Sequence, residues 1–172
     1  MKIANELERQ RHVEGNIVIS GLPKSDDLNP ESVLINLCSA LAVDESLIPK
    51  AKKANLKLVS VENKSQSHTL LRVSNLHDDL REKLMAHYRN DKRQKKYLTA
   101  GDLVENGGNK PIYLNNELTG YFQMLFKKAR DLRRMKVLKY VWEVEGKIYY
   151  KVEDGDKTVR IKHLNDLDKF YE

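Results

Sequence analysis

The side chains best suited to binding a charged ligand are concentrated between residues 127 and 139. This stretch contains one acidic residue, Asp131, and seven basic residues, which are Lys127, Lys128, Arg130, Arg133, Arg134, Lys136 and Lys139. Like charges at this density repel one another unless a polyanion neutralises them, and a phosphate backbone is the commonest large anion. The alternative is a basic face that is simply solvated. We favour the first interpretation and predict a nucleic-acid contact in this stretch.

A helix is expected to position these cations. Over residues 120–134, apolar side chains recur at three- and four-residue spacing, so the following share one face: Phe122, Leu125, Phe126, Ala129 and Leu132. The same periodicity places Lys127, Arg130 and Arg134 on a different stripe. A packed helix would therefore present its cations to solvent.

The next segment alternates like a β-hairpin, with a turn at residues 145–146. On its second strand, Lys147, Tyr149 and Lys151 share one face. A tyrosine between two lysines can stack on a base while the ammonium groups bind phosphates. The alternative is a ring that packs beneath the lysine stems.

Two further aromatic residues, Tyr140 and Trp142, lie on the first strand of this hairpin. Large aromatic side chains are usually buried, and we expect both in the core of their domain. The cations of the helix and those of the hairpin are expected to line one electropositive groove.

Composition limits the class of protein. The chain has 172 residues, of which 40% are hydrophobic and 33% charged, with a formal net charge of +6. These values indicate a folded protein that favours polyanionic partners, either nucleic acid or an anionic membrane surface. The only cysteine, Cys38, rules out an internal disulfide and a cysteine-based zinc site, and its apolar neighbours predict burial. The sequence contains no run of 18 apolar residues, so it predicts no membrane-spanning helix.

Patterns typical of enzymes are missing from the sequence. There is no phosphate-cradling glycine loop of the P-loop type, and the five histidines do not have metal-ligand spacing. We therefore expect a non-enzymatic protein without a cofactor, a metal ion or a small-molecule substrate.

Residues 15–100 alternate in a β-α-β-β-α-β order. The expected strands lie at 16–21, in the later part of 50–61, at 69–73 and weakly at 97–99. One expected helix begins at Pro30, and a second covers 76–92. This order is that of the ferredoxin-like fold, which RNA-recognition motifs also have. The predicted fold class is thus α+β, with an RNA-recognition-motif-like domain followed by a small α/β domain.

The predicted domain organisation has four parts. Residues 1–14 form a charged helical tail, interpreted as a candidate remnant of a coiled coil, and 15–100 form the first domain. Residues 101–110 are rich in glycine and read as a linker. Residues 111–172 form the C-terminal domain, with a strand at 112–114, the cationic helix, the hairpin, a strand near 158–161 and a helix at 164–170.

The first domain is expected to bind nucleic acid mainly through phosphates. RNA-recognition motifs stack bases on aromatic residues of their first and third strands, and neither 16–21 nor 69–73 contains one. Arg72 is the only cation within the third strand. A second basic cluster follows the helix at 76–92 and contributes Arg93, Lys95 and Lys96 as candidate contacts.

The order of several short motifs resembles two related protein families. The motifs are NIVISGLP at 16–23, KPIYL at 110–114, ELT at 117–119, KAR at 128–130, YVW at 140–142 and GKI at 146–148. This pattern, from about residue 15 to 170, is similar to the RNA-binding protein from the first reading frame of LINE-type retrotransposons. It also resembles the baculovirus few-polyhedra protein.

The resemblance to the retrotransposon protein implies a function. Such proteins grip single-stranded nucleic acid with both domains, coat RNA in ribonucleoprotein particles as chaperones, and form oligomers through an upstream coiled coil. Lys127 and Lys128 match their basic positions early in the C-terminal helix, and Lys151 matches the end of the hairpin. We therefore expect single-stranded RNA or DNA as the partner, in cytoplasmic ribonucleoprotein, the nucleus or both. The few-polyhedra resemblance implies the alternative, a protein-interaction adaptor.

Overall fold

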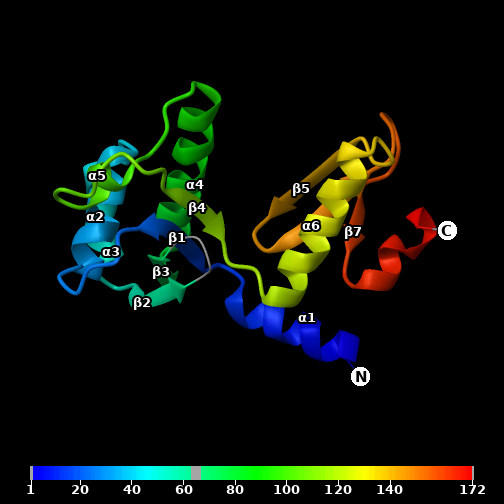
Figure 1. Ribbon diagram of the computed structural model, residues 1–172, viewed down its shortest axis with the longest axis horizontal. Helices are drawn as coiled ribbons and strands as arrows, with labels where there is room; N and C mark the ends of the chain where they lie inside the picture. The colour runs from blue at the N-terminus through cyan, green and yellow to red at the C-terminus, as the bar shows by residue number, and fades with distance from the viewer. Residues whose placement is uncertain (1, 63–66, 172) are drawn as a thin grey trace. The chain divides into compact units, whose positions relative to one another are not determined.

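The computed structural model describes residues 2–62 and 67–171, and the chain divides into two compact units (Figure 1). The first unit is Gly15–Asn115, and the second combines Met1–Glu14 with Asn116–Glu172. Each unit has its own hydrophobic core. The chain is thus an α+β protein with one sheet in each unit.

The first unit alternates strands and helices. Its strands are β1 (Ile17–Leu22), β2 (Asn55–Glu62), β3 (Ser67–Ser74) and β4 (Tyr113–Asn116), the last of which reaches the unit boundary. Its helices are α2 (Pro30–Ala40), the 3₁₀ helix η1 (Glu45–Leu47), α3 (Ile48–Ala51), α4 (Asp78–Arg93) and α5 (Ala100–Leu103). The sequence explains the start of α2, because Pro30 follows the cap residue Asn29, whose side chain accepts a hydrogen bond from the Ser32 amide.

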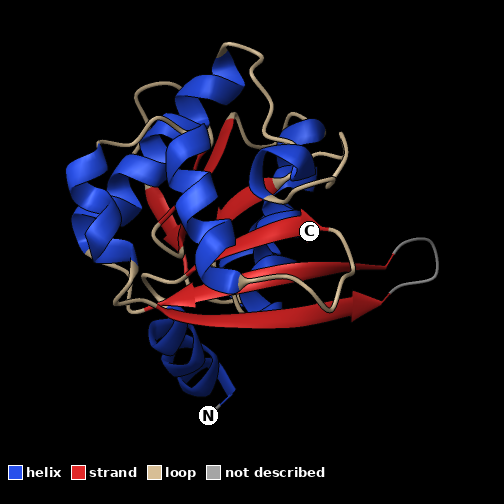
Figure 2. Ribbon diagram, turned by 90° about the vertical axis from the view of Figure 1, so that its left-hand side faces the viewer, coloured by secondary structure: helices blue, strands red, loops and turns tan. Residues whose placement is uncertain are grey.

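The four strands form one sheet in the order β2-β3-β1-β4. β3 runs antiparallel to both β1 and β2, and Figure 2 shows β2 and β3 as long neighbouring strands. Side chains alternate between the two faces, so Ile17, Ile19, Leu71 and Val73 are buried against the helices. The opposite face, which carries Arg72, is not part of this core.

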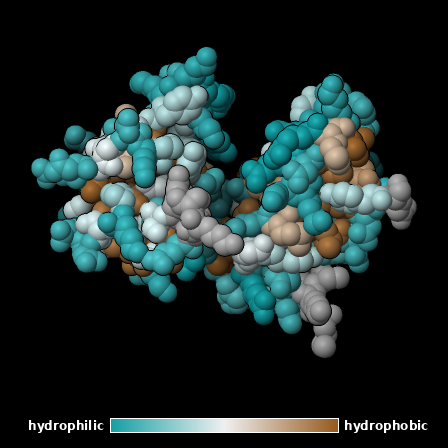
Figure 3. All heavy atoms as spheres, viewed as in Figure 1, coloured by the Kyte–Doolittle hydropathy of each residue, from teal (hydrophilic) through white to brown (hydrophobic). Residues whose placement is uncertain are grey.

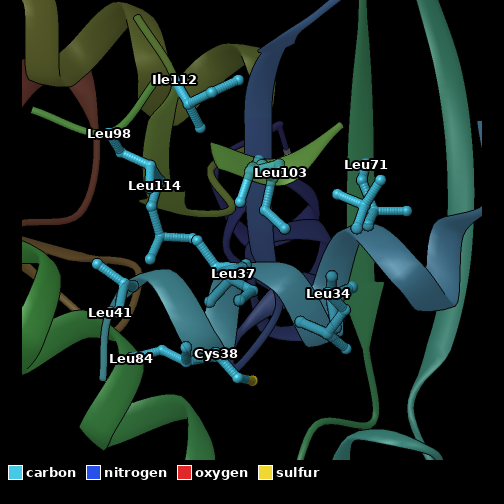
Figure 4. Packing of buried hydrophobic residues seen from close by; sticks show 14 of the residues in the cluster. Leu34, Leu37, Cys38, Leu41, Leu71, Leu84, Leu98, Leu103, Ile112 and Leu114 are labelled. Atoms are coloured by element: carbon cyan, nitrogen blue, oxygen red, sulfur yellow. The ribbon is translucent and has the colours of Figure 1, made fainter. Parts of the chain in front are cut away.

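Leucine side chains dominate the core of the first unit (Figure 4). Leu34, Leu37 and Cys38 of α2 pack with Leu71 of β3 and Leu84 of α4, and all are fully buried. Burial raises the pKa of the Cys38 thiol to about 11. The predicted burial of Cys38 is confirmed.

The fourth strand differs from the one expected at residues 97–99. Thr99 forms only an isolated bridge to Pro111, and its side chain shares a capping box with Asp102 at the start of α5. The strand that completes the sheet is β4, where the sequence suggested the start of the C-terminal domain. The residues expected to form a linker also fold onto the first unit, because Leu103 is buried in its core and the Lys110 carbonyl accepts a hydrogen bond from the Ala100 amide.

The second unit packs a helix on a three-stranded sheet. Its elements are α1 (Lys2–Val13), α6 (Gly120–Arg134), β5 (Tyr140–Val144), β6 (Lys147–Lys151), β7 (Val159–Ile161) and the 3₁₀ helix η2 (Leu164–Phe170). The sheet order is β5-β6-β7, with antiparallel neighbours. The core lies between α6 and one face of this sheet, and it contains Phe122, Leu125, Ile148, Tyr150 and Ile161.

The hairpin turn occurs at residues 145–146, as the sequence predicts. Glu145 and Gly146 have φ angles of 50° and 84°, the left-handed conformation that a two-residue hairpin turn requires. The Glu143 carboxylate accepts a hydrogen bond of 2.8 Å from the Gly146 amide and one of 3.0 Å from Asn116. These bonds fix the turn and hence the register of β5 against β6.

Helix α1 belongs to the second unit, whereas the sequence suggested a separate tail. Gln10 is 1% exposed, and its side chain bonds to the segment before α6 through the Glu117 carbonyl at 3.2 Å and the Thr119 amide at 2.9 Å. Leu7 packs against the core of the same unit. The apolar side of this helix, over the residues whose side chains are described, is therefore used within the unit rather than left as a coiled-coil seam.

Candidate nucleic-acid interface

The sheet of the second unit has two chemically different faces. Strand pairing places Trp142 opposite Tyr149, and Tyr149 opposite Arg160. Paired residues of an antiparallel ladder project to the same side, so these three side chains form a row across β5, β6 and β7. Their sequence neighbours Val141 and Tyr150 point into the core. The row therefore lies on the face that α6 does not cover.

The two rings of this row are stacked. The Trp142 and Tyr149 centroids lie 5.8 Å apart, and the ring planes meet at 24°. Arg160 is half-buried beside Tyr149, and its Nε has no hydrogen-bond partner among the described residues. A guanidinium group is planar and can both stack on a ring and bind a phosphate. The row thus offers a flat π surface next to a cation.

Two lysines and a further tyrosine complete this surface. Lys147 pairs with Val144, and Lys151 pairs with Tyr140, so both lysines lie on the same face as Tyr149. We call this surface the aromatic face, defined by Tyr140, Trp142, Lys147, Tyr149, Lys151 and Arg160. The predicted trio of Lys147, Tyr149 and Lys151 is thus found together on one surface.

One edge of the aromatic face is held by a carboxylate. Asp154 accepts a hydrogen bond of 2.6 Å from the Tyr140 hydroxyl and forms an ion pair with Lys139. These contacts lower the pKa of Asp154, mainly through the bond from Lys139. The bond to Asp154 raises the pKa of Lys139 and of Tyr140. Lys139 is therefore charged but already paired with a carboxylate, which makes it less suited to binding a phosphate than Lys151.

Helix α6 carries the predicted basic stripe. The Thr119 side chain caps the helix by accepting a hydrogen bond from the Phe122 amide at 3.3 Å. The exposed cations of the helix, which we call the α6 basic stripe, are Lys127, Arg130, Arg133 and Arg134. Figure 3 shows hydrophilic side chains over most of the surface in view, including the outer side of α6.

Neighbouring side chains modify the cations of α6 to different degrees. Arg134 lies 3.5 Å from Asp131 in an exposed ion pair, and such pairs contribute little. The Arg130 guanidinium sits 4.5 Å from the centre of the Phe126 ring. Lys128 is half-buried, and its ammonium lies 5.6 Å from the Tyr171 ring centre. Lys127 and Arg133 are exposed.

The α6 basic stripe and the aromatic face lie on opposite sides of the second unit. The buried side of α6, which includes Phe122 and Leu125, packs on the core face of the sheet. Its outer stripe therefore points away from the sheet, and the aromatic face points the other way. The expected single groove between helix and hairpin cations is not formed, because the intervening hydrophobic core separates them.

The predicted contacts of the first unit are also divided between two faces. Arg72 is half-buried on the open face of the four-stranded sheet, between Val18 and Lys57 of the adjacent strands. Arg93, Lys95 and Lys96 are exposed at the end of α4, which packs on the core face. These cations therefore do not form one site with Arg72.

Two negative findings concern residues 2–62 and 67–171. No group of three or more histidine, cysteine or acidic side chains there could hold a metal ion. No helix in that part of the chain is both long and apolar enough to cross a bilayer.

Comparison with known proteins identifies a similarity in the second unit. Residues 119–171 match the family described as baculovirus FP protein domain 2. The matched segment runs from the cap of α6 to the end of η2 and contains both the α6 basic stripe and the aromatic face. A search of curated proteins gives no match. The few-polyhedra part of the resemblance is thus supported for this segment, and the retrotransposon part stays a prediction.

Sequence reasoning missed three members of the aromatic face. Tyr140 and Trp142 were expected in the core, but Tyr140 is 42% exposed and Trp142 is half-buried on the open side. Arg160 of β7 is not among the predicted contacts. A usable signal was present, because a two-residue turn at 145–146 fixes the register and places Trp142 opposite Tyr149. The two lysines that flank Tyr149 then mark that side as the open one.

Proposed function

We propose that this chain is a non-enzymatic protein that binds single-stranded RNA or DNA with low sequence specificity. The observation that carries the proposal is the row of Trp142, Tyr149 and Arg160 on an open sheet face, flanked by Lys147 and Lys151. Every base has a π face, so stacking on such a row tolerates any sequence and contributes about 1–3 kcal/mol per base. The flanking ammonium groups bind the phosphates on either side.

The spacing along β6 suits a continuous strand. Lys147 and Lys151 each lie two residues from Tyr149, a separation of roughly 7 Å along an extended strand. A base on the central row would therefore have a cation within reach in both directions of the nucleic-acid backbone. Duplex bases are already stacked on one another, so this arrangement favours single strands.

The remaining features support the proposal in secondary roles. The α6 basic stripe raises the local positive potential and would speed the approach of a polyanion without contacting the bases. The strand order and the helix-covered face of the first unit support the RNA-recognition-motif-like interpretation. In this proposal the protein coats RNA in a cytoplasmic or nuclear ribonucleoprotein particle and acts as a chaperone.

A second candidate is a protein-interaction adaptor. The match of residues 119–171 to baculovirus FP protein domain 2 favours it, because that family is the one the comparison supports. The α6 basic stripe would then bind an acidic protein surface. The two candidates use opposite faces of the same unit, so mutations can separate them.

The test compares one variant of each face. A labelled oligonucleotide of about 20 nucleotides is titrated by fluorescence anisotropy with the parent and with two variants, K147Q/K151Q/R160Q and R130Q/R134Q, at several salt concentrations. We expect K147Q/K151Q/R160Q, the sheet variant, to bind weakly. The slope of the logarithm of its binding constant against the logarithm of salt concentration should be smaller by about 0.7 for each phosphate contact removed. The helix variant should retain most of the affinity.

Two outcomes would reject the proposal. One is the absence of measurable binding by the parent at about 50 mM salt, where electrostatic binding is strong. The other is equal affinity of the parent and the sheet variant, with circular dichroism confirming that the variant is folded.

A further inference from the structure

The first unit contains a cavity that the proposed interface does not use. Its volume is about 690 Å³, within the range of small-molecule sites. It lies at one end of the four-stranded sheet and touches three strands, through Ser20 of β1, His68 of β3 and Tyr113 of β4. The loop at residues 107–111 forms its other wall.

Tyr113 presents its ring on the open face of the sheet. Its neighbours Ile112 and Leu114 are 2% and 1% exposed and point into the core, so Tyr113 projects to the opposite side, where it is 49% exposed. Strands β1 and β3 contribute no phenylalanine, tyrosine or tryptophan to that face, and β3 contributes the imidazole ring of His68. The sheet nevertheless has a stacking surface, supplied by its edge strand.

The wall of the cavity is held in place by backbone contacts. The Ala100 amide donates to the Lys110 carbonyl at 2.9 Å, Gly101 to Gly108 at 2.7 Å, and Ile112 to Leu98 at 2.8 Å. Gly21, with φ of 93°, lets the loop approach β1, since a Cβ there would lie 2.5 Å from the Pro111 carbonyl oxygen. A wall fixed in this way loses little conformational entropy when a ligand binds.

The polar lining of the cavity is suited to an anion. Lys24 and Lys110 both line it, together with His68. Lys24 forms an ion pair of 2.5 Å with Glu62, but both side chains are exposed, and such a pair exchanges readily for a phosphate. An aromatic ring beside two ammonium groups is the combination that recognises a base together with its phosphate.

We infer that this cavity binds one nucleotide unit, with the base on Tyr113 and the phosphate at Lys110 and Lys24. The choice of ligand class rests on the proposed function, since the nucleotide would belong to a bound single strand. The same chemistry would also accept a free 5′-nucleotide. The site differs from the aromatic face in its unit, its strands and its cations.

The experiment titrates the intact protein with 5′-AMP, 5′-UMP and inorganic phosphate while backbone amide signals are followed by NMR. We expect saturable shifts at Gly108 and Tyr113, at lower concentrations for the nucleotides than for phosphate. Tyr113→Leu should weaken nucleotide binding at least tenfold. Tyr97→Leu changes another exposed tyrosine of the same unit (63% exposed) and should leave the affinity unchanged.

Several results would overturn the inference. These are nucleotide shifts that do not saturate, a Tyr113→Leu protein that binds as the parent does, or phosphate that binds as tightly as the nucleotides. If Tyr113→Leu does not fold, Lys110→Gln replaces it, and an unchanged affinity of that variant for the nucleotides would equally reject the site.

A crosslinking experiment with an oligonucleotide separates this inference from the proposed function. Photo-crosslinking of a strand that contains 4-thiouridine should label the segment around Tyr113 as well as β6. Label on β6 alone would reject the cavity and leave the proposed function intact. Label around Tyr113 alone would support the cavity and would reject the aromatic face as the surface that binds the strand.

Discussion

Trp142 of β5 and Tyr149 of β6 stack across the hairpin, with ring centroids 5.8 Å apart. The two residues are paired because the turn at residues 145–146 sets the register of the strands. Ring pairs of this kind stabilise a sheet by about 0.5–1.5 kcal/mol beyond their buried area. The pair is therefore ordered before any ligand arrives, and a base that adds to it does not bear the cost of ordering the rings.

Replacing one ring of this pair should weaken nucleic-acid binding. We expect Tyr149→Leu to raise the Kd for a single-stranded oligonucleotide by about 5- to 150-fold, the equivalent of about 1–3 kcal/mol for one lost stack. Fluorescence anisotropy at fixed salt measures the change.

The matched control for this substitution is Tyr171→Leu. Tyr171 is also exposed and belongs to the same unit, but it contacts Lys128 of α6 rather than the sheet. If the two variants lose affinity equally, the loss does not come from the aromatic face.

Local patterns in the sequence were sufficient for much of the second unit. The apolar spacing of residues 120–134 gives the buried side of α6, and the turn at 145–146 gives the hairpin. The orientation of β5 was not obvious, because its aromatic side carries more apolar surface than the side of Val141 and Glu143. Packing decides the outcome, since Val141 is paired with the buried Tyr150 and Glu143 with the buried Ile148.

Long-range partners explain the remaining differences. In the sequence, residues 112–114 look like an isolated apolar run. Strand β4 becomes part of the first sheet only by pairing with β1, some 90 residues earlier in the sequence. The interaction of Gln10 with residues 117–119 also lies beyond any sequence window. A glutamine in a charged helix gives no sign that it will be buried.

Gln10 should contribute to the stability of the second unit. Gln10→Ala leaves the Glu117 carbonyl and the Thr119 amide without these bonds, and we expect it to lower the free energy of unfolding by about 1–3 kcal/mol. Urea unfolding followed by Trp142 emission measures this, since Trp142 is the only tryptophan. Arg9→Ala on the exposed side of α1 is the control, and an equal loss there would contradict the account.

Cys38 should resist alkylation while the first unit is folded. Its side chain is 0% exposed, and burial raises the pKa of the thiol to about 11, so little reactive thiolate forms at pH 8. We expect iodoacetamide to label the native protein far more slowly than the protein in urea, by mass spectrometry. Similar rates in the two conditions would show that this core is open.

The ion pair of Lys139 with Asp154 should appear in the pH dependence of stability. The pKa of Asp154 is lowered from 3.8, so its contribution is present above pH 3.8 and is lost as pH falls through the lower folded value. The pKa of Lys139 is raised from 10.5, so its contribution is present below pH 10.5 and is lost as pH rises through the higher folded value.

The thermal midpoint of the parent should therefore exceed that of Asp154→Asn between these limits, and the difference should shrink in acid and in strong alkali. Asp156→Asn is a control on the same loop. A difference that does not depend on pH would show that Asp154 acts through packing or hydrogen bonding alone.

Trp142 emission gives the most direct test of the aromatic face, because no other tryptophan contributes. The protein is titrated with an unlabelled single-stranded oligonucleotide at low salt, and the same mixtures are measured by anisotropy with a trace of labelled strand. We expect saturable quenching of Trp142 with the same midpoint as the anisotropy change, and in K147Q/K151Q/R160Q both changes should move to much higher oligonucleotide concentration. Binding seen by anisotropy with Trp142 emission unchanged would contradict it.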